Sequence, residues 1–337
     1  MHEIYDIWPD ISHEQYESDL QPIDFGDISH VVFAGMGGSG AISDIFASIL
    51  SKTNIHVEVI KGYLLPKTVD TNSLVITTSV SGNTEETLNI LKSANNLKCK
   101  TLSFSDNGKM EKYCIDNKLN HRKISKIHSP RASFPAFLFS MLRVLEPFLP
   151  INTIDIKDSI KKLEKQKKEI SSENLTDTNP AINFAKWITD IPVIYYPWGF
   201  QAAAIRFKNS LQENTKMHAM TEDIIETCHN GIVAWDKESK VKPILIQGDN
   251  DYIKTKERWK IIREFFVERN VDYYEIHSVN GSILSKLINL IYFLDYTTIY
   301  RAVLSEINPT PVIPIDLTEG AWEALLGATS KATLESL

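Results

Sequence analysis

Two short segments of the sequence combine glycines with hydroxyl side chains in a way that suits phosphate binding. The first is G-M-G-G-S-G (35–40), which follows a short apolar run, and the second is S-V-S-G-N-T (79–84), which follows a β-branched run and opens a helical pattern. Glycines let the backbone approach a phosphate at a helix N-terminus, where free N–H groups and the helix dipole favour negative charge. The alternatives that involve no ligand are a tight turn in the first segment and helix caps in the second. We expect a phosphate cup made by Gly37, Gly38, Ser39, Ser79, Ser81 and Thr84.

The spacing of Gly35, Gly37 and Gly40 also matches the dinucleotide pattern G-x-G-x-x-G, which on its own is a weak signal. A nicotinamide site also needs an acidic residue at the end of the second strand. Glu58 lies at roughly the right separation, but it stands inside the run V-E-V-I. The hydroxyl-rich second segment therefore favours a phosphate monoester, bound without metal or organic cofactor.

The two loops together resemble the sugar-isomerase (SIS) domain, which binds phosphosugars. The segment 206–235 resembles the second-domain signature of the bifunctional phosphoglucose/phosphomannose isomerases, and the likeness extends over about residues 30–315. Several separated motifs occur in the right order, which is stronger than any single motif. The matching residues are Arg206, Lys208, Glu213, Asn214, Lys216, Glu226, His229 and Asn230.

The resemblance implies a role for three residues. Glu213 is the base that carries a proton between C2 and C1 of the open-chain sugar, through a cis-enediol(ate). His229 opens the sugar ring, and Arg131, in P-R-A-S-F-P, stabilises the developing enediolate. Taken alone, such a glutamate is usually a surface charge and such a histidine is usually structural, so the signature carries the assignment. Family members place the histidine of one subunit in the site of its neighbour, which implies a homodimer.

The sequence departs from the family signature at three places. His-Asn-Glu is here His229-Asn230-Gly231, and the Pro-Glu turn is Ile225-Glu226. The catalytic lysine of the family's C-terminal helix has no counterpart in I-N-P-T-P-V-I-P-I-D-L-T-E-G, and the next lysine is Lys331. Lys331 acts from another position, another group does its work, activity is reduced, or the C-terminus is foreign to the family.

The elements that position these residues alternate between short apolar or β-branched runs and helical patterns in both halves of the chain. Such alternation predicts an α/β fold of two SIS-type domains, each a parallel sheet flanked by helices in a flavodoxin-like sandwich. A lysine-rich helical stretch separates the halves. We expect an N-terminal domain at 1–150, a helical linker at 151–185, a C-terminal domain at 186–316 and a tail at 317–337.

Composition narrows the class of partner. The 337 residues carry a net charge of −7, which argues against nucleic acid and anionic membranes. Three unpatterned cysteines and an N-terminus without a signal sequence indicate a reducing, cytoplasmic location.

These features favour an isomerase that converts glucose 6-phosphate and mannose 6-phosphate to fructose 6-phosphate. A non-catalytic phosphosugar sensor and an aminosugar-phosphate isomerase are the alternatives, and a nucleotide-dependent dehydrogenase ranks last.

Overall fold

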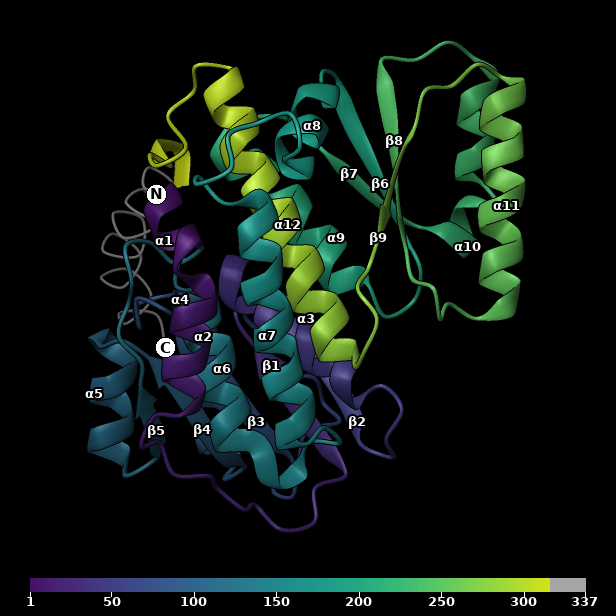
Figure 1. Ribbon diagram of the computed structural model, residues 1–337. Helices are drawn as coiled ribbons and strands as arrows, with labels where there is room; N and C mark the ends of the chain where they lie inside the picture. Colours follow the sequence, from purple (N-terminus) through teal and green to yellow (C-terminus); the bar gives the residue numbers. More distant parts are fainter. Residues whose placement is uncertain (316–337) are drawn as a thin grey trace, which may run out of the picture.

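The computed structural model describes residues 1–315, which form two parallel sheets with helices between and around them (Figure 1). The N-terminal sheet has the strand order β2-β1-β3-β4-β5, the flavodoxin-like order. Its strands are β1 (His30–Ala34), β2 (His56–Ile60), β3 (Leu74–Thr78), β4 (Lys100–Ser105) and β5 (Asn120–Lys123). The predicted α/β class is therefore confirmed.

The C-terminal sheet repeats this topology with one strand fewer. Its order is β7-β6-β8-β9, so counting from β6 reproduces the order 2-1-3-4. The strands are β6 (Ile191–Tyr196), β7 (Met220–Asp223), β8 (Val241–Gln247) and β9 (Tyr274–His277). This repetition is the duplication that the alternating pattern predicted.

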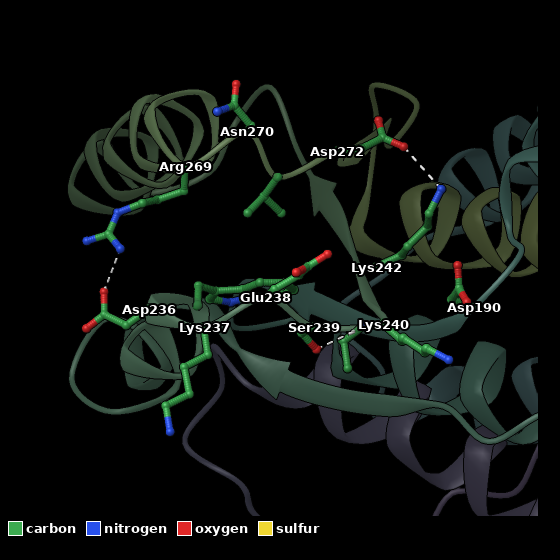
Figure 2. Close-up of a pocket in the computed structure, with 13 residues that line it drawn as sticks. Asp190, Asp236, Lys237, Glu238, Ser239, Lys240, Lys242, Arg269, Asn270 and Asp272 are labelled. Carbon is green, nitrogen blue, oxygen red and sulfur yellow. Dashed lines mark hydrogen bonds and ion pairs between the residues drawn. The ribbon is translucent and has the colours of Figure 1, made fainter.

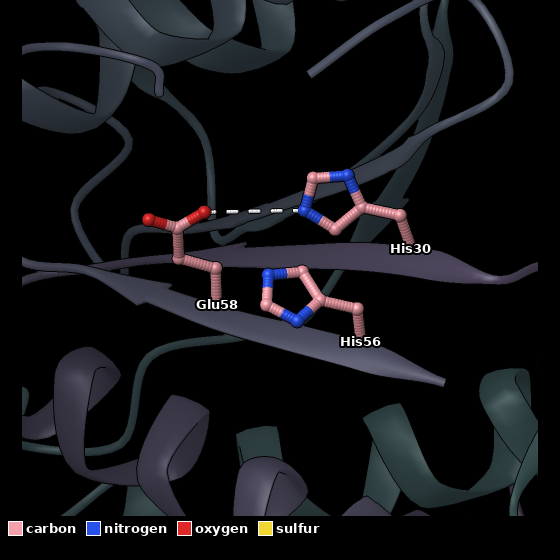
Figure 3. A group of neighbouring side chains, drawn as sticks. All are labelled: His30, His56 and Glu58. Carbon is pink, nitrogen blue, oxygen red and sulfur yellow. Dashed lines mark ion pairs between the residues drawn. The ribbon is translucent and has the colours of Figure 1, made fainter. Parts of the chain in front are cut away.

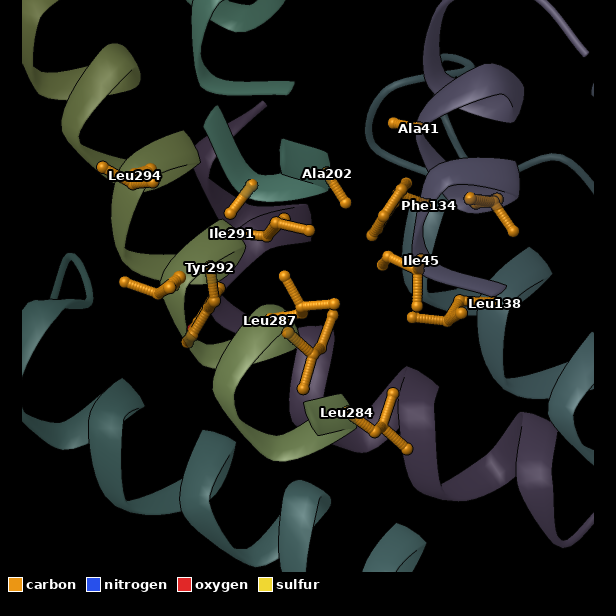
Figure 4. Close-up of a cluster of buried hydrophobic side chains, with 14 of the residues drawn as sticks. Ala41, Ile45, Phe134, Leu138, Ala202, Leu284, Leu287, Ile291, Tyr292 and Leu294 are labelled. Atoms are coloured by element: carbon orange, nitrogen blue, oxygen red, sulfur yellow. The ribbon is translucent and has the colours of Figure 1, made fainter. Parts of the chain in front are cut away.

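The helices between the sheets share one hydrophobic core. Figure 4 shows Ala41 and Ile45 of α3 (Gly37–Leu50) facing Phe134 of α6 (Phe134–Leu145), with Ala202 of α9 (Gln201–Ser210) and Ile291 of α12 (Ile283–Leu304) nearby. All five side chains are 3 % exposed or less. Burial of these apolar side chains holds α9 against α3, and so brings the end of α9 toward the first glycine loop.

The remaining helices surround the sheets. On the N-terminal side they are α1 (His2–Asp6), α2 (Trp8–Tyr16), α4 (Glu85–Asn96) and α5 (Gly108–Asn117). On the C-terminal side they are α10 (Ile224–Thr227) and α11 (Ile253–Glu268). Within the described chain, no helix is both long and apolar enough to span a membrane.

The lysine-rich stretch between the halves folds as α7 (Thr153–Ile170) and α8 (Pro180–Trp187). Ile156, Ile160 and Leu163 bury one face of α7 in the shared core. Its exposed lysines are Lys157, Lys161, Lys165 and Lys168. The domain limits at 1–150, 151–185 and 186–316 stay a prediction, and the predicted tail with Lys331 lies outside the described residues.

Candidate functional site

Glu213 lies on an irregular turn that continues α9. Residues Leu211–Thr215 form a π-helical turn, and Lys216 ends it in the left-handed conformation, with φ of 58°. Single π-helical turns inside helices occur frequently at functional sites. The Glu213 side chain keeps 25 % of its surface exposed, so its carboxylate is anchored and still open to a ligand.

Arg131 holds that carboxylate on one side. Its Nη1 donates to Oε2 of Glu213 at 3.1 Å, and its Nε donates to Oδ1 of Asn214 at 2.8 Å. Asn214 is itself fixed by Thr298, whose Oγ1 accepts from Nδ2 at 2.8 Å. Among the described residues, the second oxygen of Glu213 makes no hydrogen bond, so it is available for a substrate proton.

A segment near the end of the described chain completes the surroundings of Arg131. Nη2 of Arg131 donates to the carbonyl oxygens of Pro309, at 2.5 Å, and Thr310, at 2.9 Å. Lys216 binds the next carbonyl, that of Pro311, at 2.8 Å and also the carbonyl of Glu213. We call residues 309–311 the proline strap. No motif or spacing in the sequence indicates this contact.

Among the described residues, Lys216 is a lysine that lies beside Glu213. Burial lowers the pKa of its ammonium group below the ordinary value, and the nearby Arg131 lowers this pKa further. A lysine with a lowered pKa gives up its proton more readily.

A buried ion pair between Arg206 and Asp295 holds the backbone of Arg131 in place. Arg206 binds Asp295 through Nη2 at 2.6 Å and stacks on the Phe134 ring at 3.8 Å. The same nitrogen donates to the backbone oxygen of Arg131 at 2.9 Å. Both charged side chains are 3 % exposed or less, so this pair fixes the backbone of Arg131 from the protein interior.

The first glycine loop faces this group across a small cavity. Gly37 and Gly38 line it together with Arg131, Arg206 and Glu213. A Cβ added at Gly38 would lie 3.6 Å from the Pro130 oxygen, and Gly37 has φ of +51°. The helix α3 begins at Gly37 without a side-chain cap, so its first N–H groups are open to an anion. Ser39, in the same turn, is 5 % exposed.

The second loop lies at the same edge of the sheet, because β1 and β3 are paired neighbours. The hydroxyl groups of Ser79 and Thr84 are 2.9 Å apart, and Ser79 Oγ accepts from the N–H of Gly82 at 3.1 Å. The hydroxyl of Ser81 accepts from the N–H of Asn83 at 3.2 Å. No side chain caps α4, contrary to the simple cap alternative, but none of the three hydroxyl residues lines the small cavity.

The structure does not bring His229 to Glu213 within one chain. His229 is exposed in the turn after α10, and α10 packs with α11 in a separate core on the other face of the C-terminal sheet from α9. The residue that replaces the family glutamate, Gly231, lies against another carboxylate. A Cβ there would come within 2.6 Å of both oxygens of Glu222, so Glu222 supplies a negative charge beside the histidine turn.

Another hollow lies away from this group, at the amino ends of β6, β8 and β9 (Figure 2). Its volume is about 400 Å³, which exceeds that of the small cavity at Glu213. Two ion pairs lie in its lining, with Arg269 at 2.8 Å from Asp236 and Lys242 at 3.1 Å from Asp272. It contains none of the residues expected from the sequence to act on a sugar phosphate.

Comparison with known proteins supports the two-domain fold. The SIS-domain family matches residues 25–142, and the bacterial phospho-glucose isomerase C-terminal SIS domain matches residues 177–319. In solved structures, a putative phosphosugar isomerase from Bacillus subtilis has a TM-score of 0.64 at 17% identity, covering 92% of this chain and 97% of that one. A protein from Thermus thermophilus reaches 0.69 at 12% identity, covering 96% and 89%. The chain is therefore a protein of two SIS domains.

Its sequence relatives define the group more closely. The bifunctional phosphoglucose/phosphomannose isomerase of Caldicellulosiruptor bescii is 29% identical, with 86% of this chain and 88% of the relative aligned. The enzyme of that name from Aquifex aeolicus is 26% identical, over 94% and 97%. The chain is a homologue of the bifunctional phosphoglucose/phosphomannose isomerases, and the resemblance seen in its motifs is confirmed.

Proposed function

We propose that this protein interconverts glucose 6-phosphate and mannose 6-phosphate with fructose 6-phosphate. The observation that carries the proposal is the Glu213 carboxylate, held by Arg131 at 3.1 Å beside the cavity of the first glycine loop. A base, a cation and an anion-binding helix end then meet at one place, as proton transfer within a phosphorylated sugar requires.

In the proposed reaction, the free oxygen of Glu213 removes the proton from C2 of the open-chain aldose. The electron pair of the C–H bond forms the C1=C2 double bond, and the carbonyl electrons move to O1. Arg131 stabilises the resulting enediolate charge. The proton of the O2 hydroxyl passes to O1, and Glu213 returns its own proton to C1 as the C2–O2 bond becomes the ketone. The two aldoses differ only at C2, so both give the same intermediate.

The proposal also assigns the phosphate-binding residues, the ring-opening group and the oligomeric state. The uncapped starts of α3 and α4 hold the phosphate, with Gly37, Gly38, Ser39, Ser79, Ser81 and Thr84 around it. The exposed His229 opens the ring in the site of a second subunit, because its own sheet separates it from Glu213. The working form is thus a homodimer, and we place it in the cytoplasm.

The test is conversion of each aldose phosphate to fructose 6-phosphate by wild type and Glu213→Gln. The amide keeps the size of the side chain but cannot accept the proton, so we expect both activities to fall by about 10²–10⁴-fold. Glu257→Gln is the matched control, because Glu257 is exposed and pairs with Lys254.

An unchanged rate in Glu213→Gln would contradict the assigned base. Thermal stabilisation of the wild type by either sugar phosphate, without turnover, would instead favour a phosphosugar sensor.

A further inference from the structure

Three potential metal ligands meet at the end of the N-terminal sheet opposite the glycine loops. His30 opens β1, and His56 and Glu58 lie on the neighbouring edge strand β2, with His30 paired to His56 in register. One nitrogen or oxygen of each side chain lies within 4.8 Å of those of the other two. Figure 3 shows the two rings and the carboxylate turned toward one another.

Hydrogen bonds on the far side of His30 set its tautomer. The hydroxyl of Ser73 lies 3.1 Å from Nδ1 of His30 and 3.1 Å from the carboxylate of Asp70. Because that hydroxyl has one proton and a carboxylate is the stronger acceptor, Ser73 donates to Asp70. Nδ1 of His30 then carries a proton and donates to Ser73, which leaves the lone pair on Nε2. This arrangement, in which the second imidazole nitrogen is fixed by a hydrogen bond, is typical of metal-binding histidines.

The lone pair of Nε2 has no hydrogen-bond partner in the described chain. This atom is buried, and the nearest oxygen of Glu58 is 3.9 Å away, beyond hydrogen-bond range. A buried acceptor nitrogen therefore faces the oxygen of a half-buried carboxylate, and the described chain places no donor between them. A cation between the two groups would pair with both of them, either as a second proton on His30 or as a metal ion.

His56 decides between these two cations. A proton bridges only two acceptors, whereas a metal ion binds three or four ligands. His56 supplies a third potential ligand, because its ring centroid lies 4.9 Å from that of His30. We propose that His30, His56 and Glu58 bind a divalent transition metal, with Zn²⁺ as the ion that two imidazoles and one carboxylate suit best. His56 is exposed, so water completes the coordination from the open side.

The geometry is within reach of a zinc site. Ligand atoms about 2.0–2.2 Å from tetrahedral zinc stand roughly 3.3 Å apart, so each needs to move by about 1 Å. Glu58 is 35 % exposed on an edge strand and can make that movement by changing its rotamer. His30 is the fixed ligand, because Ser73 holds it and its strand neighbours Val32 and Ala34 are buried.

The position of this cluster separates it from the proposed sugar chemistry. The glycine loop follows the carboxyl end of β1, and His30 lies at its amino end, about 13 Å away along the strand. A metal ion here joins the edge strand β2 to β1, and so stabilises the sheet without entering the proposed reaction.

The test is titration of the full chain, stripped of metal with a chelator, with Zn²⁺ by calorimetry and with Co²⁺ by visible absorption. We expect saturation at one ion per chain and a rise in melting temperature. His56→Ala and Glu58→Gln each remove a ligand without touching the core, and we expect affinity to fall by at least about 10–100-fold. Ser73→Ala, which releases the tautomer, is expected to weaken binding by about tenfold.

His277→Ala is the matched control, because His277 is an exposed histidine that pairs with Asp249 at 3.8 Å in the other sheet. It should bind zinc as the wild type does. Absence of stoichiometric binding in the wild type, or unchanged affinity in both His56→Ala and Glu58→Gln, would overturn the proposal and leave a proton on His30 as the bridging cation.

Discussion

At the scale of single residues, Arg131 has the most demanding role. It reaches a carboxylate, an amide oxygen and two backbone carbonyls at once, and its side chain is 5 % exposed. Only a planar guanidinium offers donors in so many directions. One guanidinium therefore holds both Glu213 and the proline strap, so the proposed catalysis and the local structure depend on the same side chain.

We expect Arg131→Lys to lower kcat by about 10²–10³-fold, because a single ammonium cannot replace the fork near a developing oxyanion. Steady-state kinetics with both aldose phosphates, together with a melting curve, is the measurement. The melting temperature should also fall, since the strap carbonyls lose their donors. Arg143→Lys is the control, because Arg143 pairs with Glu146 on a partly exposed face. A variant with wild-type kcat would show that Arg131 is structural alone.

At the scale of elements, the second loop depends on one glycine. Gly82 has φ of +67°, and a Cβ at this position would lie 1.7 Å from the backbone oxygen of Asn107. The backbone of Asn107 cannot move aside as a flexible side chain could, so a side chain at Gly82 would displace the whole loop.

We therefore expect Gly82→Ala to raise KM for sugar phosphates by about tenfold or more and to lower the free energy of unfolding by about 1–3 kcal/mol. Gly62→Ala is a matched control, because nothing lies within 4 Å of the position that its Cβ would occupy. Kinetics and urea unfolding of both variants distinguish the two sites. Equal behaviour of the two variants would mean that the loop does not hold the phosphate.

The sequence predicted the elements with strong apolar or β-branched runs, such as β1 and β3. It missed β5 and β7, whose sequences N-H-R-K and M-T-E-D are short and polar, because edge strands are defined by their neighbours and not by their own pattern. Gly37, Gly38 and Glu213 line one cavity, but the predicted phosphate cup and the role of Glu213 stay predictions. The π-helical turn and the strap contact were not predictable, since Arg131 and Pro309 are 178 residues apart.

At the scale of the whole molecule, the core is rich in buried tyrosines. Burial raises the pKa of Tyr195 and Tyr300 to about 12, and raises those of Tyr5, Tyr292 and Tyr296 further. In the unfolded chain these hydroxyls ionise near their ordinary pKa of 10.0. The folded state thus binds their protons more tightly.

The tighter proton binding stabilises the folded state fully below pH 10, and this stabilisation is lost as the pH rises toward 12 and beyond. We expect the urea midpoint to decrease steeply over that range. Ultraviolet titration should show fewer of the 12 tyrosines ionised in the native protein than in urea at the same pH. Coincident titration curves would contradict the buried-hydroxyl argument.

The largest question at this scale is whether two chains complete one site. In the proposed dimer, Glu213 of one subunit works with a histidine of its partner, so each site draws on both chains. Glu213→Gln and His229→Ala should each be inactive alone. After subunit exchange in an equal mixture, half of the dimers are mixed, and one of the two sites in each is intact. We therefore expect the mixture to regain about one quarter of wild-type activity. Mixing without exchange is the control, and a mixture that stays inactive although mixed dimers form would contradict a site shared between chains. If His229→Ala alone keeps its activity, another group opens the ring, and Lys216 is the candidate beside Glu213.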